Sequence, residues 1–167
     1  LRLKPSDAVR QSNLGYACLL TYKTDEAQKI YEKLKPMDQT LAQELNQEIN
    51  RQNTDHAATK ALLEGYKFSE GKDDAKAIEA FKKAIALKPS DISAHRALGK
   101  AQYDLADYSN ALTSFQTLVG LKPGDDNGHY WMGLTYSKLN QYEKAISALQ
   151  ESLRLKPDDS GASNQLG

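Results

Sequence analysis

The sequence lacks most of the features that would mark a disulfide-bonded, membrane-spanning or strongly charged protein. Cys18 is the single cysteine in 167 residues, so no disulfide can form within the chain. No apolar run approaches the length of a membrane span, and no signal peptide is visible. The 22 basic and 22 acidic residues cancel, and they cancel locally as well, with 8 against 8 in residues 1–57. Neither a nucleic-acid footprint nor a surface for anionic membranes is therefore indicated.

Signs of catalysis and of cofactor binding are equally scarce. Cys18 lies on an apolar stripe beside Leu14, which is typical of a small core residue rather than a nucleophile. Glycine-rich phosphate loops are absent, and paired aspartates stand in predicted turns and helix starts, where capping explains them. His95 and His129 hold equivalent places in neighbouring helices, which should lie about 10 Å apart, too far to share a zinc ion. No cofactor, metal site or enzymatic activity is expected.

The sequence does contain a pentapeptide of the form Leu-Lys-Pro-X-Asp, which occurs three times at intervals of 34 residues. It reads Leu-Lys-Pro-Ser-Asp at 87–91, Leu-Lys-Pro-Gly-Asp at 121–125 and Leu-Lys-Pro-Asp-Asp at 155–159. Small residues keep the same period, namely Gly65, Gly99 and Gly133, and Ala77, Ala111 and Ala145. A fixed period of this length is typical of a solenoid, in which no single unit can bury its own apolar face.

Each unit has the pattern of two amphipathic helices joined by a short turn. In residues 92–125 two apolar stripes of helical spacing flank the polar turn at 106–109, Pro123 ends the second helix and Asp125 caps the next. The recurring glycines and alanines predict close helix contacts, filled by Phe81, Phe115 and Leu149. The pattern predicts helices near 8–21, 25–35, 39–51, 56–70, 74–87, 92–105, 109–121, 126–139 and 143–155, and no strand in 58–159.

These repeats resemble the tetratricopeptide repeat (TPR). The resemblance rests on Met132-Gly133, Tyr136, Ala145, Leu149 and Pro157 and on the period of 34 residues. It implies an all-α, right-handed α-α superhelix of helix–turn–helix repeats that acts as a protein-interaction scaffold. Histidine stands at 95 and 129 where the family often has tryptophan. Gly71 comes one residue early, which predicts that its helix ends sooner or is slightly rotated.

The spacing divides the chain into segments. We expect the tail of a truncated repeat at 1–7, a degenerate TPR at 8–38, an insert at 39–57, TPRs at 58–91, 92–125 and 126–159, and the start of a truncated repeat at 160–167. Both ends therefore cut through a repeat, as in a fragment of a longer array. The degenerate TPR should lose about the last turn of its second helix, because its proline at 36 arrives early.

The insert has the pattern of one polar helix with a thin apolar seam. Leu41, Leu45 and Ile49 recur every four residues, and Asp38 is the expected N-cap. The helix should end near 50–54. A flexible linker is the alternative, which the low Gly, Ser and Pro content disfavours.

In the TPR family, the first helices of successive repeats line a concave groove that holds peptides. Here that face of residues 8–21 carries Val9, Ser12, Tyr16 and Leu19. In the later repeats the candidate peptide-binding residues are Tyr66, Arg96, Lys100, Tyr103, Tyr130, Leu134 and Lys138. Tyrosine and arginine suit such recognition. Three cations, with Asp104 the nearest acidic residue, favour an acidic and apolar peptide.

Three further expectations concern partners. Arg96 and Lys100 stand where one TPR subclass clamps the carboxylate of chaperone tails, but Trp131 replaces the next asparagine, so no chaperone-tail receptor is predicted. Single-stranded RNA binding is the alternative function, disfavoured by the zero net charge. Truncated ends should expose apolar side chains and allow self-association, the candidates being Leu1, Leu3, Leu149, Leu153 and Leu166.

Overall fold

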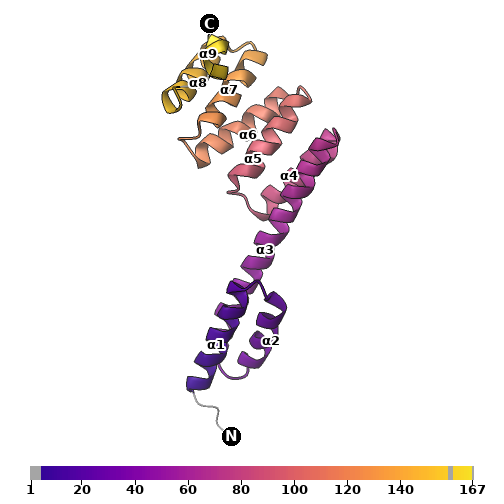
Figure 1. Ribbon diagram of the computed structural model, residues 1–167, viewed down its shortest axis with the longest axis vertical. Coiled ribbons are helices and arrows are strands. Elements are labelled where there is room, and N and C mark those ends of the chain that lie inside the picture. The colour runs from indigo at the N-terminus through magenta and orange to yellow at the C-terminus, as the bar shows by residue number, and fades with distance from the viewer. Residues whose placement is uncertain (1–4, 158–159, 167) are drawn as a thin grey trace. The chain divides into compact units, whose positions relative to one another are not determined.

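The computed structural model describes residues 5–157 and 160–166, with side chains for 7–157 and 161–165. These residues form nine helices and no strand (Figure 1), which confirms the all-α class. The helices are α1 (Pro5–Leu20), α2 (Thr24–Leu34), α3 (Gln39–Glu70), α4 (Asp74–Leu87), α5 (Ile92–Asp104), α6 (Tyr108–Leu121), α7 (Asp126–Lys138), α8 (Tyr142–Leu155) and α9 (Ser160–Leu166).

The chain divides into two compact units, Leu1–Ala57 and Ala58–Gly167, and the boundary falls inside α3. The prediction of two separate helices near 39–51 and 56–70 is wrong. Residues 50–57 contain neither glycine nor proline, and Asn, Thr and Asp each cost at most about 0.7 kcal/mol in a helix. The Thr54 hydroxyl donates to the Asn50 carbonyl one turn earlier at 2.9 Å, so the polar residues are accommodated without ending the helix.

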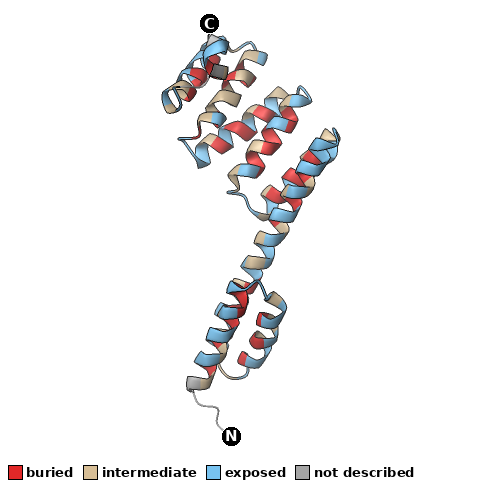
Figure 2. Cartoon of the chain, in the orientation of Figure 1, coloured by how far each residue is buried: buried red, intermediate tan, exposed pale blue. Residues whose placement is uncertain are grey.

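The N-terminal unit packs α1, α2 and the first part of α3 around one core that includes Leu19, Leu34, Leu45 and Ile49 (Figure 2). The predicted seam of the insert is thus confirmed, and Asp38 caps α3 by accepting from two backbone amides. α2 has 11 residues against 14 in α4, α6 and α8, as the early proline predicts.

Two of the residues assigned to a groove face of this unit are buried instead. Ser12 is 4% exposed and Leu19 is 2% exposed, and Leu19 packs in the core that includes Leu45 and Ile49 of the first part of α3. Val9 and Tyr16, from the same prediction, keep part of their surface exposed.

In the C-terminal unit a glycine on each first helix receives a side chain from the second helix of the pair. Gly65 faces the Phe81 ring, and a Cβ on Gly99 would lie 2.6 Å from Cε1 of Phe115. Gly133 faces Leu149 in the same way, at 2.6 Å from Cγ. The predicted close contact of small residues is confirmed, because any larger residue on the first helix would displace these buried side chains.

The turn inside each helix pair uses one residue with positive φ. These residues are Lys72, Ala106 and Asn140, again 34 apart, together with Tyr22 in the N-terminal unit. Gly71 does not adopt positive φ, and α3 ends at Glu70, which is 34 residues before the end of α5. The expectation that the early glycine shortens the helix is therefore wrong, and its alternative, a slight rotation of the helix, stays a prediction.

The turns between pairs are tied by the two equivalent histidines. Nε2 of His95 lies 2.9 Å from the Pro89 carbonyl oxygen, and Nε2 of His129 lies 2.9 Å from that of Pro123. Each histidine thus bonds the proline six residues earlier, which is a structural role within one repeat.

At the C-terminal end Leu149 is 3% exposed, which corrects its assignment to an exposed apolar face. It packs on Gly133. Leu153 is half-buried. The other candidates, Leu1, Leu3 and the side chain of Leu166, lie outside the described residues.

Candidate binding surface on α5 and α7

Trp131 on α7 is the centre of an aromatic cluster that joins α7 to α5. Its ring packs edge-to-face against Tyr103 of α5 at 5.4 Å and against Tyr130 at 5.8 Å between centroids. Tyr108 at the start of α6 packs edge-to-face on Tyr103 at 5.2 Å. We refer to these four residues as the Trp131 cluster. All four are half-buried, so each ring contributes exposed surface while its position is fixed by packing.

The core supports this cluster from below. The fully buried Phe115 ring stacks on Trp131, with centroids 5.9 Å apart and an interplanar angle of 16°. Since Phe115 also fills the space above Gly99, the period-34 core contact and the exposed aromatic surface share one side chain.

Lys100 places a cation on the same surface. Its Nζ lies 5.2 Å from the centroid of the Trp131 ring, within the range of a cation–π interaction, and the side chain is exposed. Burial raises the pKa of the Tyr103 hydroxyl, and Tyr108, Tyr130 and Asp104 add to that shift. Tyr103 therefore remains protonated at neutral pH and can donate a hydrogen bond to an anionic group.

Arg96, another predicted site residue, serves the fold. Its Nη2 lies 2.7 Å from Oδ2 of Asp125, and Nζ of Lys122 lies 3.2 Å from the same oxygen. Oδ1 of Asp125 accepts the Gly128 amide at 2.9 Å, so this carboxylate caps α7, as predicted, while it pairs with α5. The expectation that Asp104 is the nearest acidic residue on this face is wrong, because Asp125 neutralises Arg96.

Asp125 is 3% exposed, which makes its ionisation state sensitive to its partners. Burial raises the pKa of this carboxyl, but the Gly128 amide, Lys122 and Arg96 outweigh burial and hold the pKa below its usual range. The carboxylate is therefore charged at neutral pH, and its ion pair with Arg96 connects the start of α7 to α5.

The remaining predicted residues lie around this centre. Tyr66 is 41% exposed and packs edge-to-face on Phe81 at 5.4 Å. Burial raises its pKa, Arg96 lowers it and Asp91 raises it, so Tyr66 lies within electrostatic reach of Arg96. Lys138 is exposed at the end of α7. Ring and cation contacts join Lys100, Tyr103 and Tyr130 through Trp131, whereas one continuous wall with Tyr66 and Lys138 stays a prediction.

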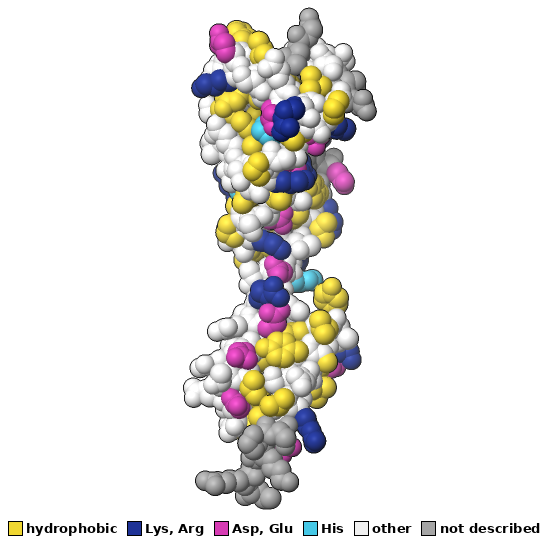
Figure 3. All heavy atoms as spheres, turned by 90° about the vertical axis from the view of Figure 1, so that its left-hand side faces the viewer, with side chains coloured by type: hydrophobic (Ala, Val, Ile, Leu, Met, Phe, Trp, Pro, Cys, Tyr) yellow, Lys and Arg dark blue, Asp and Glu magenta, His cyan; other side chains and the backbone are white. Residues whose placement is uncertain are grey.

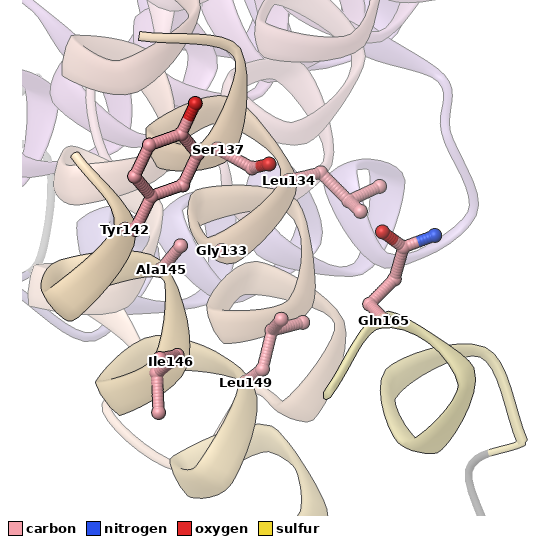
Figure 4. A pocket seen from close by; sticks show the side chains of 8 residues that line it. All are labelled: Gly133, Leu134, Ser137, Tyr142, Ala145, Ile146, Leu149 and Gln165. Atoms are coloured by element: carbon pink, nitrogen blue, oxygen red, sulfur yellow. The ribbon is translucent and has the colours of Figure 1, made fainter. Parts of the chain in front are cut away.

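Leu134 opens onto a pocket of about 220 Å³. Figure 4 shows its lining from three helices, with the Gln165 side chain of α9 extending toward Leu134. A shift of 34 residues relates Gln165 to Trp131 and Ser137 to Tyr103. The smaller residues of this last pair leave open the space that aromatic rings fill one repeat earlier.

Sequence reasoning missed Trp131 as a site residue and treated it only as a departure from the chaperone-tail clamp. A signal was present, because the equivalent position one repeat earlier is Ala97. A tryptophan in the place of an alanine either separates the helices or leaves part of its ring exposed. Here the ring is partly exposed, and Phe115 and Tyr103 hold it in place.

Within 5–157 and 160–166, no helix is both long and apolar enough to cross a membrane. The same part of the chain holds no group of three His, Cys, Asp or Glu side chains placed to bind a metal ion.

Comparisons with known proteins place these repeats among tetratricopeptide repeats. One family model, described as TPR repeat, matches residues 65–106, and another, described as tetratricopeptide repeat, matches 127–159. No curated protein matches the chain.

Several solved structures share the fold. The TPR domain of Arabidopsis OM64 is 18% identical, with a TM-score of 0.66 over 68% of this chain and 93% of that one. The first TPR of Spaghetti (RPAP3), solved with the HSP90 peptide SRMEEVD, is 20% identical, with a TM-score of 0.65 over 66% and 88%. MamA 41-end from Desulfovibrio magneticus RS-1 is 21% identical, with a TM-score of 0.64 over 95% and 81%.

Proposed function

Because this chain is a tetratricopeptide-repeat protein, we propose that it is a non-catalytic interaction scaffold that holds a peptide segment of a partner protein on α5 and α7. TPR units are generally scaffolds, and the predicted repeats at 58–91, 92–125 and 126–159 supply the helices of this surface. The degenerate repeat at 8–38 and the insert at 39–57 form a separate part of the proposed scaffold.

The observation that carries this proposal is the Trp131 cluster with Lys100 beside it. Tryptophan and tyrosine contribute most to binding where they are rigid and only partly covered, because little conformational entropy remains to be lost. Phe115 fixes the Trp131 ring from below, and Tyr103 fixes it from the side. The surface is therefore ordered before a ligand arrives.

Charge supports an acidic and apolar ligand. With Arg96 neutralised by Asp125, Lys100 and Lys138 are the cations of the predicted site that remain for a partner. The RPAP3 structure provides a precedent on the same fold, since its bound HSP90 peptide, SRMEEVD, has three acidic side chains. Trp131 stands in the place of a clamp asparagine and Arg96 is engaged elsewhere, so the proposed ligand is an internal acidic segment rather than a chaperone tail.

The test is a double charge reversal, Lys100→Glu with Lys138→Glu. The partner is recovered by pull-down with the full-length protein and mapped to a peptide, whose affinity is then measured by calorimetry at one salt concentration. We expect binding to weaken about tenfold or more, since two ion pairs and the cation–π contact are lost together. Arg96 is left intact because its reversal would disturb the buried Asp125 and confuse stability with binding.

The matched control is Lys82→Glu with Lys83→Glu, two exposed lysines of α4. This variant has the same change in net charge, so it should bind the peptide within about twofold of the wild type. Equal losses in the two variants would place the ligand elsewhere. Retention of single-stranded RNA by the wild type, lost in Lys100→Glu with Lys138→Glu, would instead favour the RNA-binding alternative.

A further inference from the structure

An apolar row on α1 is left uncovered in the N-terminal unit. Val9, Tyr16 and Leu20 are separated by seven and four residues, which places them on one face of the helix. Leu20 is 81% exposed, Val9 is 49% exposed and Tyr16 is half-buried. Isolated exposed leucines are ordinary, but three large apolar residues in one helical row form a patch.

This row borders the contact between α1 and the first part of α3. On the adjacent row of α1, Ser12 and Leu19 are buried, and Leu19 belongs to the core that includes Leu45 and Ile49 of α3. The side-chain amide of Gln52 donates to the Leu19 carbonyl at 3.3 Å, so α3 runs directly beside the row. The exposed apolar residues therefore form one wall of a surface whose other wall is α3.

The α3 wall is acidic. Residues 39–57 contain Glu44, Glu48 and Asp55 against one arginine, Arg51. Arg51 is bound to Glu48, and Glu44 is exposed. Burial raises the pKa of the Tyr16 hydroxyl, and Glu44 and Glu48 raise it further, so both carboxylates lie near the apolar row. The lower half of Figure 3 shows hydrophobic side chains gathered over this unit with acidic ones beside them.

We propose that this face, made of Val9, Tyr16, Leu20 and Glu44, binds a second peptide segment that carries apolar side chains together with lysine or arginine. The apolar row gives such a segment contact area, and the exposed Glu44 carboxylate selects for positive charge, since Glu48 is already paired with Arg51. The proposed ligand of α5 and α7 has the opposite charge. One chain would thus hold two segments of different chemistry, and neither site depends on the other.

The experiment selects ligands with the whole chain from a phage-displayed library of random 12-residue peptides. Clones that bind the wild type are screened against the variant Leu20→Ser with Glu44→Lys. Both side chains are exposed, so the variant should fold, which circular dichroism verifies. A matched control, Leu121→Ser with Glu32→Lys, changes an exposed leucine of α6 and an exposed glutamate of α2.

We expect a class of peptides, rich in lysine or arginine and in apolar residues, that binds the variant at least tenfold more weakly and the control equally well. Binding of that class should survive Lys100→Glu with Lys138→Glu. If no clone loses affinity in the variant, or if the affected clones are acidic or uncharged, the proposal is wrong. Light scattering that shows a dimer of the wild type and a monomer of the variant would also overturn it, because a second copy would then occupy the face.

Discussion

The two units of this chain bury an equivalent glycine in different ways. In the C-terminal unit Gly99 receives the Phe115 ring from the second helix of its own pair. In the N-terminal unit a Cβ on Gly15 would meet two methyl carbons of Leu45, from α3, before it reached Ile30 of α2. The contact on this glycine is thus made within one helix pair in the C-terminal unit, whereas in the N-terminal unit a third helix makes the nearest contact.

The same contrast appears on the surfaces. The C-terminal unit exposes tyrosines, a tryptophan and lysine, fixed by the rings beneath them. The N-terminal unit has no fully buried aromatic ring among its described residues and exposes the apolar row of Val9, Tyr16 and Leu20 beside carboxylates. The units therefore differ in two ways. An aromatic ring fills the glycine contact in one unit and a leucine of a third helix fills it in the other, and the two surfaces are suited to ligands of different charge.

The largest expected effect comes from removing the core side chain of each unit. Phe115→Ala should lower the free energy of unfolding by about 3–5 kcal/mol, and Leu45→Ala by about 2–5 kcal/mol, since both side chains are fully buried. Trp131, the single tryptophan, stacks on Phe115 and reports the C-terminal unit alone. Urea unfolding should be followed by Trp131 fluorescence and by far-UV circular dichroism in parallel.

For Phe115→Ala we expect the fluorescence midpoint to fall. For Leu45→Ala we expect the circular-dichroism transition to begin at a lower urea concentration, while the midpoint of the fluorescence transition changes less. If both probes move together by the same amount in both variants, the chain unfolds as one cooperative unit and the comparison between units has no thermodynamic meaning.

The sequence predicted the helices between residues 74 and 155 to within about one residue at each end, because their signals are local. The pentapeptide, the capping aspartates and the small residues each act within a few residues of where they stand, so helix ends could be placed. The continuity of α3 was missed because Asn50, Asn53 and Thr54 are weak helix formers, and weak propensity alone ends no helix without glycine or proline. The role of Arg96 was missed because its partner, Asp125, is 29 residues away in the next repeat.

The next effect tests that ion pair. Asp125→Asn keeps a capping oxygen for α7 but removes the charge that holds Arg96 and Lys122, so it should cost about 1.5–3 kcal/mol at neutral pH. Folding lowers the pKa of Asp125, so its stabilising charge is complete above the usual aspartate pKa and is lost as the pH falls below it. Between about pH 5 and pH 2 the free energy of unfolding should therefore fall more steeply with falling pH in the wild type than in the variant, as denaturation at a series of pH values would measure.

Asp91→Asn is the control for this pair, because Asp91 caps α5 in the same way but Leu62 stands in the equivalent place to Arg96. Asparagine caps nearly as well as aspartate, so this variant should cost less than about 1 kcal/mol. A loss equal to that of Asp125→Asn would show that capping, and not the contact with Arg96, provides the stability.

A third effect compares the two glycines directly. Gly99→Ala should cost about 1–3 kcal/mol, because three atoms of the buried Phe115 ring lie within 2.9 Å of the new methyl group. Gly15→Ala should cost less, because the methyl ends of Leu45 can move aside. Gly120 in α6 has open space around it, so Gly120→Ala should stabilise the protein by up to about 1 kcal/mol. This variant reports the gain in helix propensity without any change in packing. Equal losses at Gly99 and Gly15 would remove the distinction between a ring and a flexible side chain as packing partner.

The smallest effect concerns the turn that both units share. Tyr22 has φ of 57° and Ala106 has φ of 59°, and neither side chain favours this left-handed region. Glycine relieves the strain but adds freedom to the unfolded chain, so Tyr22→Gly and Ala106→Gly should each raise stability by about 0.5–1 kcal/mol. Asn140→Gly should gain less, since asparagine tolerates positive φ. Thermal unfolding measures all three. Similar gains at Tyr22 and Ala106 would mean that the degenerate repeat kept the turn of the regular ones while its core changed, whereas a loss at Tyr22 would mean that its exposed ring stabilises the N-terminal unit.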